Sequence, residues 1–129
     1  MAADIKRNLK HVRRRIAAAA DRVGRSADDI KLVAVSKMHP AEVLREAMHA
    51  GVSVFGENKV REGEGKILEI GREGIEWHLI GHLQSNKARK AVQLFDFIHT
   101  VDSIDIAHRL ERICTEEGRE RLEQPRSSR

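Results

Sequence analysis

The sequence lacks several features that would assign it to whole classes of proteins. Its 129 residues include a single cysteine, Cys114, so no disulfide can form within the chain. No apolar run approaches the roughly 20 residues that a membrane-spanning helix needs. The opening segment, MAADIKRNLK, has no apolar core of the kind found in signal peptides. We therefore expect a cytoplasmic protein with no membrane contact.

Aromatic residues are also scarce, which bears on the meaning of the basic charge. Aromatics make up 3% of the residues and tyrosine is absent, whereas the net charge is +4. Proteins that bind single-stranded nucleic acid stack bases on aromatic side chains. We therefore interpret the basic N-terminal segment as a solvated helix face and do not expect nucleic acid as a partner. Binding of RNA or another anionic surface by residues 1–25 is the alternative. The basic residues concerned are Lys6, Arg7, Lys10, Arg13, Arg14 and Arg15.

Motifs for nucleotides and metals are missing as well. No GxGxxG follows the first expected strand and no Walker pattern occurs, which argues against dinucleotide-binding and P-loop proteins. His78 and His82 have a spacing that can hold a metal on a helix, but here the pair spans a strand end and a glycine. A zinc site needs further ligands, so we expect no metal site.

What the sequence does contain is an alternation of apolar runs and amphipathic stretches. KLVAVS at 31–36 is typical of a strand buried on both faces, and further strands are expected at 52–56, 75–81 and 96–101. Apolar residues spaced three and four apart predict helices around them. The expected helices cover 5–23, 40–50, 57–73, 85–95 and 103–118, and Ser85 is the expected N-cap of the fourth. The expected apolar side of the third helix consists of Val60, Ile67, Leu68 and Ile70. The expected inner face of the fifth consists of Ile104, Ala107, Leu110, Ile113 and Cys114.

Repeated strand–helix units predict an α/β fold with a parallel sheet. Two architectures have this pattern: a small doubly wound open sheet, and a (β/α)8 barrel, which needs about 250 residues. Four units amount to the first half of such a TIM-type barrel, preceded by an N-terminal helix. Pro125 and the surrounding charges in RERLEQPRSSR do not suit a fifth central strand. We expect a half-barrel domain over residues 1–118 and a polar, disordered tail over 119–129.

A lysine follows the first expected strand, in LVAVSKMHP at 32–40. In both architectures functional side chains gather at the carboxyl ends of the strands, so Lys37 is a candidate site residue. From the local pattern alone, a lysine that marks the strand's exit into solvent is the simpler interpretation. The functional interpretation is an amine that forms a Schiff base with a carbonyl compound. Partial burial would favour the neutral amine that this reaction requires.

Four motifs stand at successive expected strand ends: LVAVSK, FGENKV, WHLIGHLQSNK and HTVDS. Taken together and in this order, they resemble the pyridoxal-phosphate homeostasis protein family over about residues 5–118. The resemblance implies a barrel like the N-terminal domain of alanine racemase, with pyridoxal 5'-phosphate held as a Schiff base on Lys37. It also implies that Asn58 lies beside the cofactor and that His82, in the rim segment GHLQSNK, contacts it.

The resemblance also implies a function. Members of this family resemble carriers or buffers of pyridoxal phosphate in vitamin B6 homeostasis rather than enzymes, so no catalytic residue is expected. The alternative is a racemase-like enzyme that uses pyridoxal phosphate on amino acids and needs a second acid or base facing Lys37. By the same resemblance, the phosphate site lies in the second half of the barrel, so we expect this chain to bind the cofactor weakly. The open strand edges of a half barrel also favour self-association.

Overall fold

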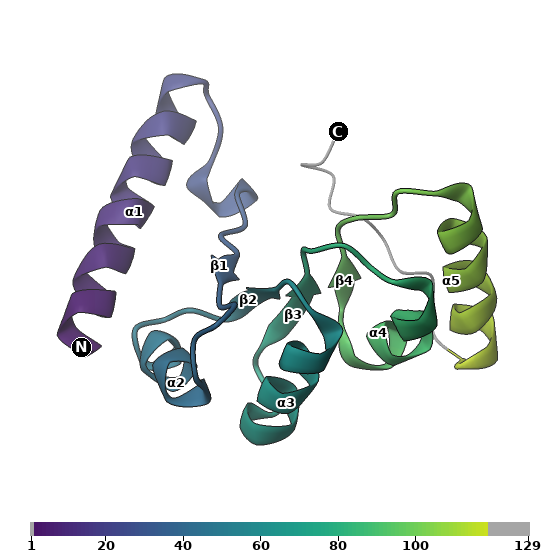
Figure 1. Ribbon diagram of the computed structural model, residues 1–129. Helices are drawn as coiled ribbons and strands as arrows, with labels where there is room; N and C mark the ends of the chain where they lie inside the picture. The colour runs from purple at the N-terminus through teal and green to yellow at the C-terminus, as the bar shows by residue number, and fades with distance from the viewer. Residues whose placement is uncertain (1, 119–129) are drawn as a thin grey trace.

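Four parallel strands form one sheet, with helices packed along one of its faces (Figure 1). The computed structural model describes residues 2–118. The strands are β1 (Ala34–Val35), β2 (Val54–Glu57), β3 (Glu76–Leu79) and β4 (Phe97–Ile98). The helices are α1 (Ala2–Arg22), α2 (Ala41–His49), α3 (Val60–Ile70), α4 (Ala88–Leu94) and α5 (Ile104–Glu116), with short 3-10 turns η1 (Ala27–Asp29) and η2 (Ser85–Lys87).

The sheet order β1-β2-β3-β4 follows the order of the chain. Each strand therefore pairs in parallel with its sequence neighbour, and each returning segment crosses over through a helix. This arrangement confirms the predicted α/β fold of repeated strand–helix units behind an N-terminal helix. All four strands point the same way, so their carboxyl ends meet at one edge of the sheet.

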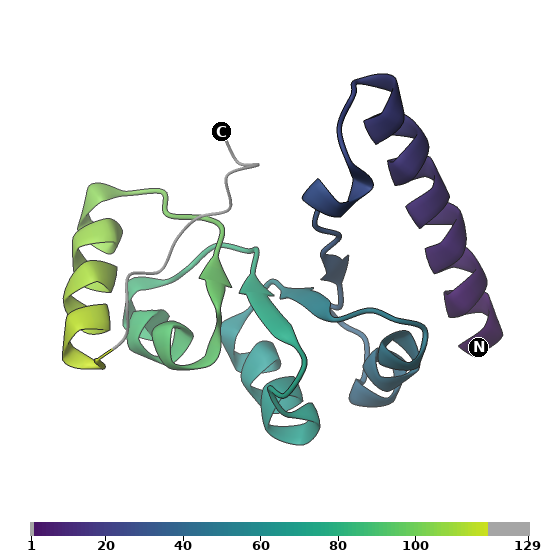
Figure 2. The same ribbon diagram turned by 180° about the vertical axis from the view of Figure 1, so that it is seen from behind.

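The N-terminal helix α1 lies at the β1 end of the molecule and packs against α2 (Figures 1 and 2). Its packed stripe is narrow: Ile5, Leu9 and Ile16 are half-buried and Ala20 is buried. The six basic residues expected on a solvated face, from Lys6 to Arg15, are all exposed. The helix therefore meets its neighbours along one line of side chains and leaves most of its surface in water.

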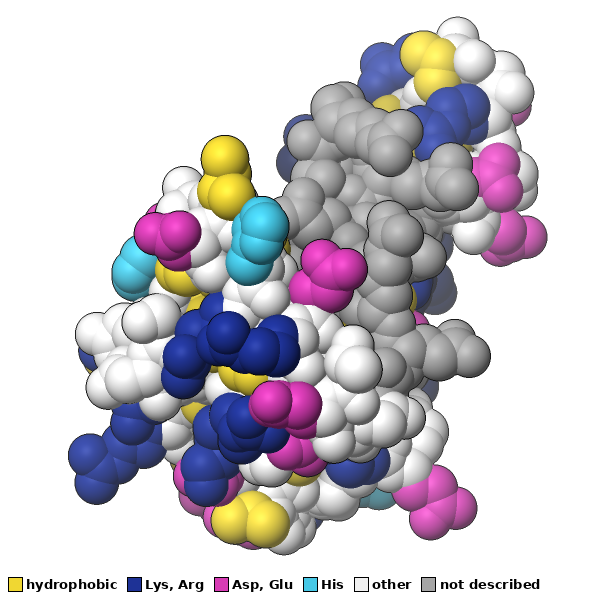
Figure 3. Space-filling view, turned by 90° about the vertical axis from the view of Figure 1, so that its right-hand side faces the viewer, with side chains coloured by type: hydrophobic (Ala, Val, Ile, Leu, Met, Phe, Trp, Pro, Cys, Tyr) yellow, Lys and Arg dark blue, Asp and Glu magenta, His cyan; other side chains and the backbone are white. Residues whose placement is uncertain are grey.

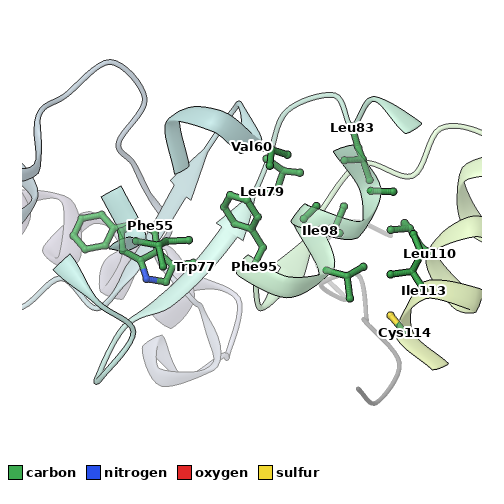
Figure 4. Packing of buried hydrophobic residues seen from close by; sticks show 14 of the residues in the cluster. Phe55, Val60, Trp77, Leu79, Leu83, Phe95, Ile98, Leu110, Ile113 and Cys114 are labelled. Carbon is green, nitrogen blue, oxygen red and sulfur yellow. The ribbon is translucent and has the colours of Figure 1, made fainter. Parts of the chain in front are cut away.

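The core lies between the sheet and the helices. Figure 4 shows it as a continuous band of side chains that begins at Phe55 and Trp77 and reaches Ile113 through Phe95. The rings of Phe55 and Trp77 lie 5.6 Å apart, and the indole nitrogen of Trp77 donates to the carbonyl of Gly71 at 3.1 Å. Gly63 lets the ring of Phe95 approach α3, because a Cβ there would lie 2.5 Å from Phe95 Cζ.

Helix α5 presents a different face from the one expected. Leu110, Ile113 and Cys114 are buried as predicted, but Ile104 is 76% exposed and Ala107 is exposed too. Ile106 packs against the core in their place. Successive residues of a helix turn by about 100°, so Ile104 falls on the far side of α5 from Ile106.

Two further predictions about helices are wrong. Ser85 does not cap α4, because the turn η2 begins at Ser85 and intervenes before the helix, whose N-cap is Lys87. On α3, Leu68 is 77% exposed, and the long side chain buried beside Ile67 is that of Lys66. The hydrogen bonds described below account for a buried lysine at this position.

The first strand is shorter and more open than expected. KLVAVS was predicted to be buried on both faces, but β1 has two residues and Val35 is 51% exposed. The ladder stops at Ser36, because its carbonyl oxygen accepts instead from His39 N at 3.2 Å and from Lys66 Nζ. Val35 lies on the sheet face opposite the helices.

The expected disordered tail, residues 119–129, lies outside the described residues. Between residues 2 and 118, none of the helices combines the length and apolar character needed to cross a membrane.

Candidate cofactor site

The carboxyl edge of the sheet carries all three residues predicted for the site. Lys37 lies in the turn after β1, Asn58 directly follows β2, and His82 is in the loop after β3. Lys37 and His82 are exposed, whereas Asn58 is half-buried. The strands are parallel neighbours (Figure 1), so residues that follow their carboxyl ends lie along one edge of the sheet. This is where ligands bind in parallel α/β folds.

The loops after β2 and β3 are packed directly against each other. A Cβ on Gly81 would lie 2.3 Å from the carbonyl oxygen of Asn58 and 2.9 Å from its Cα. Only glycine allows this approach of the two backbones. The position of Asn58 is therefore coupled to the segment that carries His82.

His82 has a partner from the next strand end. Its Nδ1 lies 3.0 Å from Oδ2 of Asp102, which follows β4. The next residue, Ser103, caps α5 by accepting from Ile106 N at 3.1 Å, and this fixes the start of the helix. With Nδ1–H donated to Asp102, Nε2 is the ring nitrogen left for a ligand. The motif HTVDS is the sequence signal for this pairing.

Lys37 itself sits in a tight turn rather than on the strand. His39 N donates to the carbonyl of Ser36, closing the turn, and Met38 adopts a left-handed conformation with φ of 63°. The expectation that a buried strand would partly desolvate the lysine is wrong for this chain, because Lys37 is exposed. The fold therefore fixes the backbone of the turn, while the Lys37 side chain stays accessible to solvent and solutes.

Beneath this turn lies a buried ionic cluster that sequence reasoning missed. Lys66 Nζ lies 3.0 and 2.9 Å from the two carboxylate oxygens of Glu57 and 3.0 Å from Oε2 of Glu62. Glu57 is fully buried, and Ser36 Oγ donates to it. The hydrogen bond from Lys66 holds the pKa of Glu62 below its ordinary value, helped by the hydrogen bond from Met38 N and opposed by burial.

A second polar network lies on the sheet face opposite the helices. His78 Nδ1 lies 2.6 Å from His99 Nε2, and His78 Nε2 lies 2.6 Å from Oε1 of Glu76. Lys31 donates to the same carboxylate oxygen at 2.7 Å, and the ring of Phe97 stacks on His78. Burial lowers the pKa of His99, and the nearby charge of His78 lowers it further.

Within residues 2–118, no three His, Cys, Asp or Glu side chains come together as metal ligands. Figure 3 shows Lys and Arg side chains gathered on the side that carries α4 and α5, with acidic side chains among them. Arg89, for example, donates to both Glu116 and Glu117.

Comparison with known proteins identifies the family. A model of the alanine racemase N-terminal domain matches residues 5–122. The chain belongs to this family. The resemblance to the pyridoxal-phosphate homeostasis proteins expected from the four motifs is confirmed by relatives of that name. The protein of that name from Escherichia coli is 53% identical over 110 residues, and that from Vibrio cholerae is 43% identical over 110 residues.

The matches cover most of this chain but only part of its relatives. The alignment with the Escherichia coli protein takes in 83% of this chain and 47% of the relative, and the Vibrio cholerae figures are 82% and 47%. The chain therefore spans about half the length of the curated relatives it matches.

Solved structures confirm the fold. PipY of Synechococcus elongatus, solved with pyridoxal phosphate bound, is 48% identical, with a TM-score of 0.67 over 81% of this chain and 50% of PipY. The crystal structure of an unknown protein from Bifidobacterium adolescentis is 35% identical, with a TM-score of 0.80 over 91% of this chain and 52% of that chain. The four strand–helix units therefore correspond to part of an alanine-racemase-like barrel domain.

Proposed function

We propose that this chain carries the lysine half of a pyridoxal 5'-phosphate site used in cofactor homeostasis, with a Schiff base at Lys37. The observation that supports it most is the position of Lys37, an exposed amine on a fixed turn at the ligand-binding edge of the sheet. The 48% identity to PipY, whose structure contains pyridoxal phosphate, supports this compound as the ligand.

The residues on this edge fit the chemistry of that ligand. Pyridoxal phosphate supplies an aldehyde, which lysine amines attack as nucleophiles. Lys37 Nζ, in its unprotonated form, forms a C=N bond with the aldehyde carbon, and the aldehyde oxygen leaves as water. Asn58 offers a side-chain amide just after β2, the strand that pairs with β1, and the close approach of Gly81 to Asn58 keeps the two neighbouring loops together. His82, oriented by Asp102, offers a ring nitrogen.

The proposal does not include turnover of amino acids. A racemase needs an acid or base on each face of the substrate, whereas a carrier needs one reversible covalent bond to the aldehyde. Lys37 supplies that bond by itself. The function is therefore storage and release of the cofactor, and the water-accessible position of Lys37 suits release because hydrolysis of the C=N bond requires water.

Borohydride trapping tests the proposal. The purified chain is incubated with pyridoxal phosphate, reduced, digested and analysed by mass spectrometry, and labelling of Lys37 is compared with that of Lys10, an exposed lysine on α1. We expect label at Lys37 in clear excess over Lys10. The total label per chain should fall strongly in Lys37→Ala and change little in Lys10→Ala. Equal labelling of all exposed lysines, unchanged in Lys37→Ala, would overturn the proposed function.

A further inference from the structure

The backbone on both sides of Lys37 is held by one buried cluster. Lys66 Nζ donates to the carbonyl oxygen of Ser36 at 2.5 Å, and Met38 N donates to Oε2 of Glu62 at 2.5 Å. Ser36 and Met38 are the residues immediately before and after Lys37. The same lysine joins Glu62 to Glu57, so the two contacts belong to one network.

The network is anchored in the core of the domain. Glu57 ends β2 and is fully buried, and the side chain of Lys66, on α3, is 8% exposed. Lys66 has three donor hydrogens, and the acceptors around its Nζ are the Ser36 carbonyl and the carboxylates of Glu57 and Glu62. Removing either partner from such a pair is strongly destabilising, because a charge is left buried and unpaired. The cluster is therefore a rigid support for the turn.

The turn needs such a support because one of its residues has an unfavourable backbone conformation. Met38 has φ of 63°, in the left-handed region that residues other than glycine adopt only under constraint. A conformation of this kind persists where the surrounding structure over-determines it. The charge-assisted hydrogen bond from Met38 N to Glu62 restrains this conformation, together with the bond from His39 N that closes the turn. The Met38 side chain contributes little, since it is 87% exposed.

Lys66 also differs from Lys37 in what its amine can do. Its Nζ is surrounded by acceptors and shielded from solvent, whereas Lys37 is exposed. An aldehyde in solution cannot reach an amine that is enclosed by acceptors and shielded from solvent. Under the proposed function, Lys37 is therefore the lysine that reacts with the aldehyde, and Lys66 is the lysine that holds the turn.

We propose that Glu57, Lys66 and Glu62 are positioning residues that fix the Ser36–His39 turn and so set the direction and reactivity of Lys37. The inference rests on the proposed function for its cofactor readout, but the contact to the turn is measured without cofactor. Glu62 is the residue to change, because its side chain is 30% exposed and Lys66 keeps Glu57 as its partner when Glu62 is lost.

Three variants of α3 separate positioning from general damage. Glu62→Ala removes the acceptor of Met38 N–H. Glu62→Gln keeps an oxygen that can accept this hydrogen bond and removes only the charge. Glu64→Ala is the matched control, since Glu64 is on the same helix, is 31% exposed and pairs with Lys90 rather than with the turn. Circular dichroism and urea unfolding establish that each variant is folded.

The first readout is hydrogen exchange of the Met38 amide, measured by NMR without cofactor. We expect exchange to be at least about tenfold faster in Glu62→Ala, the factor for loss of one charge-assisted hydrogen bond. Glu62→Gln should restore most of the protection, and Glu64→Ala should match the parent chain. Unchanged exchange in Glu62→Ala would overturn the proposal, whatever the cofactor does.

The second readout is borohydride trapping, expressed as the Lys37-to-Lys10 labelling ratio within each sample. We expect this ratio to fall on the order of tenfold in folded Glu62→Ala and to recover in Glu62→Gln. A folded Glu62→Ala variant with faster Met38 exchange and an unchanged ratio would overturn the positioning role. A parent chain without excess label at Lys37 would overturn the proposed function instead, and the exchange measurement would then decide whether the cluster holds the turn.

Discussion

Gly81 and the carbonyl oxygen of Asn58 come so close that a Cβ on Gly81 would lie 2.3 Å from that oxygen. The neighbouring atoms are backbone, which cannot rotate away as a flexible side chain can. The contact holds the loop after β3 against the loop after β2, at the edge where Lys37 is exposed. It therefore makes the geometry of the candidate site sensitive to a single methyl group.

Gly81→Ala should destabilise the chain, because the added methyl forces the two loops apart. Overpacking of this kind costs about 1–3 kcal/mol, and urea unfolding of the parent and variant measures the difference. Gly65→Ala is the matched control: nothing lies within 4 Å of its added Cβ, and the position is exposed on α3. That change should stabilise the helix by about 0.5–1 kcal/mol. Equal effects of the two substitutions would contradict the contact between the loops.

Lys66→Met should be the most damaging single change in the buried cluster. It leaves the carboxylate of the fully buried Glu57 without its cation, which costs about 3–5 kcal/mol of unfolding free energy. The double variant Glu57→Gln with Lys66→Met removes both charges and should recover a large part of this loss. The free energies come from urea unfolding of the two singles and the double. Strictly additive effects of the two changes would show that Glu57 and Lys66 are not coupled.

The histidine pair should make the chain lose stability in mild acid. The pKa of His99 is lowered from 6.5, first by burial and second by the charge of His78. The unfolded chain therefore binds more protons than the folded chain as pH falls through 6.5, so the free energy of unfolding decreases there. Two protonated rings would also face each other across 2.6 Å.

His99→Gln should flatten this pH dependence, while the exposed control His108→Gln should leave it unchanged. Unfolding free energies of the parent and both variants, measured on either side of pH 6.5, check the prediction. The same slope in His99→Gln and the parent would assign the acid sensitivity to other groups.

The 129-residue chain should self-associate at high concentration. Within the described residues, β1 pairs only with β2 and β4 only with β3, so both outer strands have a free edge. Val35 on β1 is 51% exposed on the face opposite the helices. Free edges and exposed apolar groups promote pairing between chains, and a charge on the edge opposes it. Light scattering should therefore show species larger than the monomer, reduced in Val35→Lys; a concentration-independent monomer would refute this prediction.

The pattern of apolar residues was enough to predict the elements of the fold. The unbroken apolar runs and the apolar residues spaced three and four apart predicted strands and helices close to their observed places. The errors lie where tertiary contacts decide. Ile104 and Leu68 have the apolar character of core residues, but which face of a helix packs depends on its neighbours, and both are exposed.

The candidate site shows the same division. The four motifs were enough to place Lys37, Asn58 and His82 at one edge of a parallel sheet and to indicate the family, because strand order follows from repeated strand–helix units. No local pattern indicated that Lys66 would be buried. Its burial depends on Glu57, nine residues away on another element, and on the Ser36 carbonyl, thirty residues away.

Sequence by itself therefore determined the strand–helix alternation, the place of Lys37 after the first strand and the family, since these depend on local spacing and on motifs that can be read in order. Only the tertiary structure decided that Lys37 is exposed in a turn beside Met38, which has a left-handed conformation, and that a second lysine beneath it joins two carboxylates to that turn. The physical reason is that a buried charge persists only where partners from distant segments surround it. Those partners are brought together by the packing of α3 against the sheet.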